Sequence, residues 1–296
     1  MTKHATTVSM MKDLLSDPTK RIALDDFITE HLKKIIDATS PEHFPAQGAN
    51  VQQSDFNDRV KRYEEAAKDL QYIAILLARW GDKEHIDLLG KIFSRLAENV
   101  ERESAGLTLW LHLNWYPLQI LMYASGISAV AAGKYSVLKV VLETPVQNIA
   151  TQGRRVPLIV PVAANISDVT DFFKRMPGHE QQYAPRSELM YELSQPIIEE
   201  LLFLGKSYDE VFDEFEILSA LVFSEATSRG WGPIGRYGWK YHQRGETNPY
   251  DWIVADAKKQ KEKWPVTQAG LFQGSTENFL KLAEEFRERL NKLSWW

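Results

Sequence analysis

The sequence contains no cysteine. This absence excludes disulfide bonds, thiolate nucleophiles, and zinc or iron–sulfur sites built on cysteine ligands. It also fits a reducing compartment, so we expect a cytoplasmic protein. A chain of 296 residues needs no such cross-links, because it buries enough apolar surface to stabilise a core without them.

Long uninterrupted apolar runs are also absent. The stretch 104–133 lacks Asp, Glu, Lys and Arg, but His112, Asn114, Pro117 and Gln119 interrupt it. Spanning a membrane takes about 20 predominantly apolar residues. We therefore expect buried helices in this stretch and no membrane partner.

Sequence motifs for catalysis, phosphate binding and metal binding are missing. No Walker-type loop occurs, and no glycine-rich dinucleotide motif follows a predicted strand. The seven histidines never pair at i and i+4, so the His-Glu-x-x-His zinc motif is absent. We assign no catalytic residue, metal ligand or cofactor, although the fold can still assemble a site from distant residues.

The charge and composition are those of an ordinary globular chain. The sequence is 44% hydrophobic and 25% charged, with a net charge of −5. A net negative chain repels phosphate backbones, which disfavours nucleic acid as a partner.

Most of the chain repeats apolar residues at the 3.6-residue period of amphipathic helices. Asp17, Ser54 and Ser275 are predicted N-caps, and Ser207 with Glu210 forms a predicted capping box. Helical stripes cover 22–35, 56–77, 86–96, 135–142, 187–204, 211–222 and 279–290. We expect an all-α fold of irregular stacked helical hairpins, similar to an α-solenoid.

Three stretches need a choice or a special role. The run 107–121 alternates like a strand but also carries a helical stripe, and we predict a helix. The small residues that follow, at 123–132, are expected to let neighbouring backbones approach closely. Prolines in 156–161 exclude a central strand and predict an extended crossing segment.

The expected organisation has two parts. Residues 1–226 form the stacked hairpins, with a potential internal boundary near 145–166. Residues 227–296 form an aromatic, glycine-rich loop and a C-terminal helix that pack on the same array. The helix junction at Gly81 and Asp82 predicts one sharp hairpin.

The stretch 229–252, which we call the aromatic–basic segment, is the most unusual. It holds six aromatic residues, five glycines and four basic residues in 24 positions. The glycines predict a loop or short hairpin, and rings with cations can bind a partner or ligand. The candidate binding residues are Arg229, Trp231, Arg236, Tyr237, Trp239, Lys240, Tyr241, His242 and Arg244.

A structural interpretation of the same segment is an internal clasp. In that interpretation Trp231, Tyr237, Trp239 and Trp252 pack onto the helices, as large aromatic residues usually do in cores. Arg236 and Arg244 would then pair with acidic residues.

Two further groups of polar residues have both a functional and a structural interpretation. The acidic run comprises Asp209, Glu210, Asp213, Glu214 and Glu216. In the functional interpretation, these acids bind a cation or act in acid–base catalysis. In the structural interpretation, they lie near a helix N-terminus, where the helix dipole favours acidic side chains, and their outward face is solvated. His112 and Asn114 are expected to be core residues with satisfied hydrogen bonds.

Three fragments resemble a known class of proteins. They are 113–127 (Leu-Asn-Trp-Tyr-Pro leading to Tyr-Ala-Ser-Gly-Ile), 212–218 (Phe-Asp-Glu-Phe-Glu-Ile-Leu) and 269–275 (Ala-Gly-Leu-Phe-Gln-Gly-Ser). They are similar to helical, sensor-like C-terminal regions of multidomain bacterial anti-phage defence and signalling proteins. The resemblance runs from Asp17 onward and carries no catalytic residue. The effector domains of such proteins carry TIR, sirtuin-like or NTPase motifs, and this sequence has none of them. Three interpretations therefore remain: a separated sensing region, a fragment of a longer protein, and a stand-alone partner protein.

These observations favour a non-enzymatic helical recognition or scaffold module. Its expected partner is a protein or ligand trigger, or an effector. Two alternatives stay open: an enzyme with a fold-assembled acidic metal site, such as a nucleotide hydrolase or nuclease, and a structural subunit. In the last case exposed apolar faces, with Trp295 and Trp296, would seal a homo-oligomer.

Overall fold

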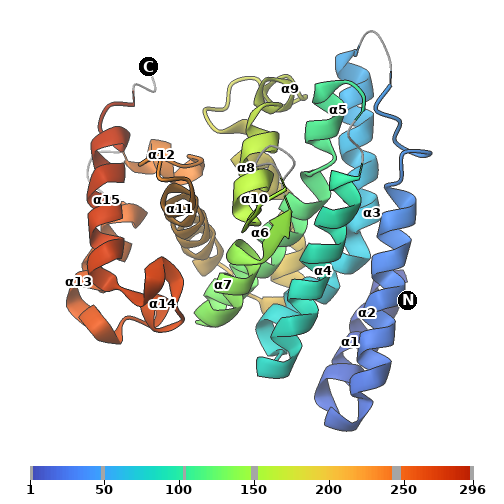
Figure 1. Ribbon diagram of the computed structural model, residues 1–296, viewed down its shortest axis with the longest axis horizontal. Coiled ribbons are helices and arrows are strands. Elements are labelled where there is room, and N and C mark those ends of the chain that lie inside the picture. The colour runs from blue at the N-terminus through green and yellow to red at the C-terminus, as the bar shows by residue number, and fades with distance from the viewer. Residues whose placement is uncertain (1–2, 48–50, 103–104, 148–152, 242–247, 294–296) are drawn as a thin grey trace.

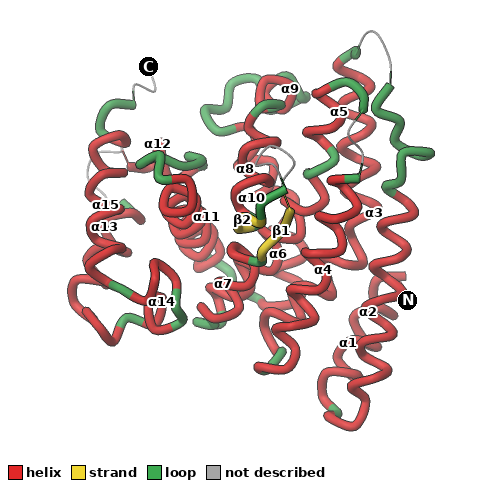
Figure 2. The backbone as a smooth tube through the Cα atoms, in the orientation of Figure 1, coloured by secondary structure: helices red, strands yellow, loops and turns green. Residues whose placement is uncertain are grey.

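A computed structural model describes residues 3–47, 51–102, 105–147, 153–241 and 248–293. Over these ranges the chain consists of helices and one two-stranded sheet, so the expected all-α class is confirmed (Figure 1). Figure 2 shows the two short strands beside a body that is otherwise helix and loop. The predictions for His242, Arg244, Trp295 and Trp296 lie outside the described residues.

The helices before the sheet are α1 (Lys3–Ser16), α2 (Arg21–Ala38), α3 (Gln53–Trp80), α4 (Lys83–Glu101), α5 (Thr108–Leu113), α6 (Tyr116–Ala131) and α7 (Tyr135–Glu143). The strands are β1 (Pro145–Gln147) and β2 (Arg155–Pro157). The later helices are α8 (Ile159–Ser167), α9 (Thr170–Lys174), α10 (Pro185–Leu202), α11 (Ser207–Thr227), α12 (Arg236–Tyr241), α13 (Pro249–Gln260), α14 (Pro265–Gln268) and α15 (Thr276–Leu290).

Helix α6 lies at the centre of the fold. Its apolar composition allows burial on every side, and each residue from Tyr116 to Val130 is buried. It packs against α3, α7, α8, α10 and α11, which come from distant parts of the sequence. The solenoid-like detail of the prediction is not confirmed, because the packing centres on this one helix.

Helix α11 connects the two ends of the molecule. One side packs against α6 and α8, while α12, α13 and α15 contact it elsewhere (Figure 1). Buried side chains occur along most of its length, from Tyr208 to Ser224. The buried side chains of α11 are therefore held between the central helices and the C-terminal helices. The predicted division into residues 1–226 and 227–296 stays a prediction.

Several helix ends follow from local sequence as expected. Gly81 ends α3, and Asp82 caps α4 by accepting hydrogen bonds from the N–H groups of Glu84 and His85. These two helices form the predicted hairpin. Asp17 caps a short 3₁₀ turn before α2, and Ser275 caps α15.

Two predicted caps are wrong. Helix α3 begins at Gln53 with Gln52 as its N-cap, so Ser54 lies inside the first turn. Helix α11 begins at Ser207, and its N-cap Lys206 makes no side-chain capping bond. Both helices therefore start one or two residues before the position that the predicted cap required.

The ambiguous run 107–121 is helical, as predicted, but forms two helices. Helix α5 ends at Leu113 and α6 begins at Tyr116, with Pro117 in its first turn, where proline is tolerated. Trp110 and Leu113 are buried, so the helical stripe determines the local structure. Of the described helices, none is both long and apolar enough to cross a membrane.

The crossing segment 156–161 is only partly extended. Val156 lies in β2 and pairs with Val146 of β1 in an antiparallel register. Helix α8 already begins at Ile159 and includes Pro161 in its first turn. That position needs no intrahelical N–H donor, so proline does not prevent the helix.

The prediction of a loop or hairpin for 229–252 is wrong in part. Residues 236–241 form α12 despite Gly238, and Trp252 lies in α13. A helical glycine costs about 1 kcal/mol relative to alanine. The contacts of Arg236 and Lys240 with acidic side chains, described below, offset that cost.

The small residues of α6 allow a close approach, although the neighbour is a ring and not a backbone. A Cβ atom at Gly126 would lie 2.1 Å from Cε2 of Phe215 on α11. The glycine is therefore needed for α6 and α11 to pack at this distance. A Cβ atom at Gly90 in α4 would meet nothing nearer than Cγ1 of Val140 at 3.6 Å.

These two glycines give a matched test of the helix contact. We expect Gly126→Ala to lower the free energy of unfolding by about 1–3 kcal/mol through overpacking. Gly90→Ala should instead raise it by about 0.5–1 kcal/mol, because alanine favours the helix. Urea denaturation of both variants measures the effects. An equal response of the two variants would contradict the packing of α6 on α11.

Candidate functional site

The acidic run and the aromatic–basic segment meet in the structure. Nζ of Lys240 lies 2.6 Å from Oδ2 of Asp209 and 2.5 Å from Oδ2 of Asp213. The Arg236 guanidinium lies 3.2 Å from Asp209 and 2.9 Å from Glu188 of α10. Positions 236 and 240 are one helical turn apart, as are positions 209 and 213. The two basic side chains of α12 therefore lie opposite the two acidic side chains of α11.

The aromatic residues of α12 strengthen this contact. Tyr237 is fully buried, and Nε1 of Trp239 donates to Glu188 at 3.2 Å. The guanidinium carbon of Arg236 lies 3.6 Å from the ring centre of Tyr191, a cation–π contact. The hydroxyl of Tyr241 donates to Oδ1 of Asn291 at 2.9 Å. This half of the segment therefore acts as the predicted clasp.

Three described residues of the segment lie at the surface. Arg229 is exposed, and the side chains of Trp231 and Trp252 are 40% and 45% exposed. The clasp interpretation is thus confirmed for Arg236 and Tyr237 and wrong for the two tryptophans. Whether any of these residues binds a partner stays a prediction.

Glu216 is, with Asp213, one of the two fully buried acids of the run. Oε1 accepts hydrogen bonds from the hydroxyls of Ser187 and Tyr123 at 2.7 and 2.8 Å. Oε2 accepts the backbone N–H of Arg236 at 3.1 Å. A Cβ atom at Gly235 would collide with this carboxyl group, so glycine is needed for the approach.

Burial dominates the electrostatics of both buried acids. It raises the pKa of Glu216 to about 7, against the hydrogen bonds from Ser187 and Tyr123 and the charge of Arg186. It raises the pKa of Asp213 to about 6, against the charge of Lys240. Perturbed acids of this kind occur both in functional sites and in structural ion-pair networks.

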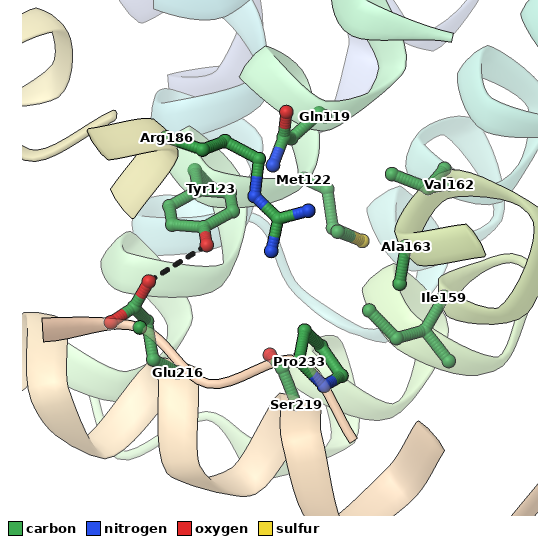
Figure 3. A pocket seen from close by; sticks show the side chains of 11 residues that line it. Gln119, Met122, Tyr123, Ile159, Val162, Ala163, Arg186, Glu216, Ser219 and Pro233 are labelled. Carbon is green, nitrogen blue, oxygen red and sulfur yellow. Dashed lines mark hydrogen bonds between the residues drawn. The ribbon is translucent and has the colours of Figure 1, made fainter. Parts of the chain in front are cut away.

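A small cavity lies beside Glu216, between α6, α8 and the loop before α12. This inner cavity has a volume of about 20 Å³, enough for one water molecule. Figure 3 shows the guanidinium group of Arg186 pointing into it, with the amide of Gln119 and the ring of Tyr123 alongside. Met122, Ile159 and Val162 make up much of its apolar wall.

Two polar atoms in this cavity have unmet hydrogen-bonding capacity. Gln119 is 2% exposed, and its Oε1 atom has no partner. Nη1 of Arg186 is also buried without a partner, and its guanidinium forms no ion pair with any described residue. Buried polar groups are almost always paired. Oε1 of Gln119 can therefore accept a hydrogen bond from an additional donor, and Nη1 of Arg186 can donate one to an additional acceptor.

Arg186 also lines a wider opening on the surface. This outer cleft has a volume of about 230 Å³ and lies between the start of α10 and the loop before α12. Its walls are mainly apolar, with Trp231, Pro233, Ile234 and Leu293 on one side. Arg186 and Pro233 line both the inner cavity and the outer cleft, so the two are adjacent.

The remaining predicted residues have protein partners. Asn114 accepts a hydrogen bond from the Tyr63 hydroxyl at 2.6 Å, and Nδ1 of His112 lies 3.3 Å from Asp168. Asn114 is buried and hydrogen-bonded, as expected, whereas His112 is only part-buried, with its side chain 22% exposed. Within the described ranges, no three acidic or histidine side chains cluster closely enough to hold a metal ion.

Sequence reasoning did not find Arg186. A single arginine after Pro185 has no distinctive spacing, and its significance comes from a buried Nη1 atom that has no hydrogen-bond partner among the described residues. Gln119 gave a weak signal, as a polar residue inside the uncharged stretch 104–133. The two residues meet only because α10 packs against α6.

Comparison with family models, curated proteins and solved structures gives no match in any of the three. The resemblance to helical regions of anti-phage defence proteins therefore stays a prediction. The geometry of the chain itself carries the functional argument.

The ion pairs of α12 predict a large loss of stability when one partner is removed. Lys240→Met leaves Asp213 buried without its cation, and we expect the free energy of unfolding to fall by about 3 kcal/mol at pH 8. The fall should be smaller at pH 5, because Asp213 then accepts a proton. Lys34→Met is the control, since Lys34 and Glu30 form an exposed pair whose loss should leave the free energy of unfolding almost unchanged. Equal losses in guanidinium denaturation would contradict the buried pairing. Arg236 and Trp239 both contact Glu188. Replacing either residue is therefore expected to lower the stability of the fold, so a loss of partner binding in such a variant would not by itself show a binding role.

Glu216 predicts a specific pH dependence. Its pKa is higher in the folded protein than the ordinary 4.5, so the folded state binds the extra proton between about pH 4.5 and 7. Stability from this group is present at low pH and is lost as pH rises through 7. Relative to Glu216→Gln, the free energy of unfolding of the wild-type protein should fall by on the order of 3 kcal/mol as the pH rises from about 4.5 to 7. If the difference in free energy of unfolding between the wild type and Glu216→Gln stays constant from about pH 4.5 to 8, the pKa of Glu216 is not raised.

Proposed function

We propose that this chain is a non-enzymatic helical recognition module that binds its partner at the outer cleft. The bound group is a carboxylate attached to an apolar or aromatic body. The observation that carries this proposal is the part-buried Arg186, which lines both cavities, forms no ion pair among the described residues and has its Nη1 atom buried without a hydrogen-bond partner there.

The carboxylate follows from the chemistry of arginine. A guanidinium group offers donors in a planar fork that matches a carboxylate in a two-bond geometry. An unpaired charge shielded from water is unfavourable, and a ligand carboxylate at the outer cleft would remove that penalty. The inner cavity, at about 20 Å³, holds a water molecule and no larger anion, so the ligand body stays in the outer cleft.

The apolar body follows from the walls of the cleft. Trp231 and Tyr183 line it and are 40% and 57% exposed, while Ile234 and Leu293 add aliphatic surface. Tryptophan, tyrosine and arginine dominate the binding energy of many protein interfaces. Trp231 is therefore the residue of the aromatic–basic segment best placed to contact a partner.

The partner we propose is a protein that presents a C-terminal carboxylate next to an apolar side chain. Following the sequence resemblance, that protein is an effector or a phage-derived trigger in bacterial defence, met in the cytoplasm. A second copy of this chain is a further proposed partner. A small carboxylic acid offers the same chemistry, and the experiment below separates these sources.

The test compares a ligand with and without its charge. Calorimetric titration with N-acetyl-phenylalanine should show binding, and N-acetyl-phenylalanine amide should bind about tenfold more weakly, because it lacks the carboxylate. Arg186→Gln and Trp231→Ala should each weaken binding of the acid to a similar extent. A longer peptide with a C-terminal phenylalanine should bind more tightly if the partner is a protein, and equally if it is a small molecule.

Control variants keep this experiment specific. Arg95→Gln removes an exposed arginine paired with Glu98, and Trp80→Ala removes a tryptophan that is 61% exposed and distant from the cleft in sequence. Both should bind the acid like the wild-type protein. Equal binding of acid and amide, or unchanged binding by Arg186→Gln, would exclude the proposed site.

A further inference from the structure

A second cleft lies on another side of α11. It has a volume of about 220 Å³ and is lined by residues of α7, α11 and α13, together with Trp264 before α14. Pockets for drug-sized ligands usually measure roughly 300–1,000 Å³, so this cleft suits the end group of a ligand. It shares no lining residue with the outer cleft.

Three carboxylates line this acidic–aromatic cleft: Glu210, Glu214 and Asp256. Glu210 lies in the first turn of α11, where the helix dipole already favours an acid. Glu214 and Asp256 lie further along their helices, beyond the turn in which the dipole acts. Asp256 is exposed, whereas Glu214 is part-buried, so Glu214 is the acid of the two that is partly shielded from water.

Glu214 forms no ion pair with any residue that the structure describes. Its Oε1 atom accepts a hydrogen bond from the Tyr135 hydroxyl at 2.7 Å, and its other oxygen has no partner among the described residues. Burial raises the pKa of Glu214, and the nearby charge of Asp256 adds to the rise. No lysine, arginine or histidine of the described ranges lines the cleft.

Asp256 is held in place by neutral donors. Nε1 of Trp264 donates to its Oδ2 atom at 3.0 Å, and Nε2 of Gln260 donates to both oxygens at 2.8 Å. These hydrogen bonds fix the carboxylate while leaving its charge uncompensated. A second negative charge is thus kept close to Glu214.

Aromatic side chains complete the cleft. Trp252 lines it and is 45% exposed, and Tyr135 and Trp264 lie deeper. Tryptophan is the ring that attracts cations most strongly, and aromatic residues with acids are the usual means of recognising alkylated ammonium groups. The charge and the rings therefore indicate the same kind of ligand.

We propose that this cleft binds an organic cation, an alkylammonium or methylammonium group. A compact metal ion fits less well, because no three acids in the described part of the chain converge closely enough to ligate one. An organic cation spreads its charge over a larger apolar surface, which suits separated carboxylates and an exposed tryptophan. The group can belong to a free amine or to a lysine side chain of a partner protein.

The test uses probes matched in shape. Choline is the cationic probe, and 3,3-dimethylbutan-1-ol is its uncharged counterpart of similar shape. We expect choline to bind in calorimetric titration and the alcohol to bind at least about fivefold more weakly. Glu214→Gln keeps an acceptor for Tyr135 but removes the charge, and it should weaken choline binding about fivefold, as should Trp252→Ala.

Further variants keep the result interpretable. Glu210→Gln changes an exposed side chain and tests the acidic charge even if Glu214→Gln fails to fold. Trp80→Ala and Glu277→Gln are the controls, because both residues are exposed and lie outside the cleft. Equal binding of choline and the alcohol, absence of choline binding, or unchanged binding by both Glu210→Gln and Trp252→Ala would each overturn the proposal.

The source of the cation is read in the same experiment. Tighter binding of spermidine than of a lysine-containing peptide indicates a free amine, and the reverse indicates a protein partner. Either result supports the cleft. The carboxylate probe for the outer cleft is independent, so one site can fail while the other holds.

Discussion

Buried Asp213 of α11 is paired with a cation, and this ion pair places α12 in the C-terminal half of the molecule. Asp213 is almost fully buried, and Lys240 is the cation that lies against it. Arg236 and Lys240 are spaced one turn apart, as are Asp209 and Asp213, so α12 has one favourable register on α11. Removing one partner of such a pair is costly, because the other charge stays buried. The clasp therefore keeps the loop before α12, and Trp231 within it, in place.

Both proposed sites depend on the same helix. Asp209, Asp213 and Glu216 recur along one face of α11, and this face meets α12 and the inner cavity. Glu210 and Glu214 lie on an adjacent face and line the acidic–aromatic cleft. The first face is neutralised by residues of the chain itself, whereas the second has no described counter-cation. This difference explains why one acidic face is structural and the other is a candidate binding surface.

Local chemistry explains which features were predictable. The hairpin at Gly81 and Asp82 depends on capping and on a glycine, both of which act within a few residues. The short helix α12 was not predicted, because Gly238 opposes it locally and only its contacts with α10 and α11 stabilise it. Helix α1 was not predicted either, because its apolar stripe is weak. Its contacts with α3 form only in the folded chain. Arg186 left no sequence signal, because burial and the lack of a counter-charge are properties of the folded chain.

The helical class follows from the amino-acid sequence, since apolar residues recur with the helical period through most of the chain. The sequence also excludes cysteine chemistry and shows that residues 229–252 are unusual. Which charges of that segment are paired, and which acidic and basic groups have no partner among the described residues, depends on how the helices pack. The reason is that charge compensation acts through space, between helices such as α6, α10 and α11 that lie far apart along the chain.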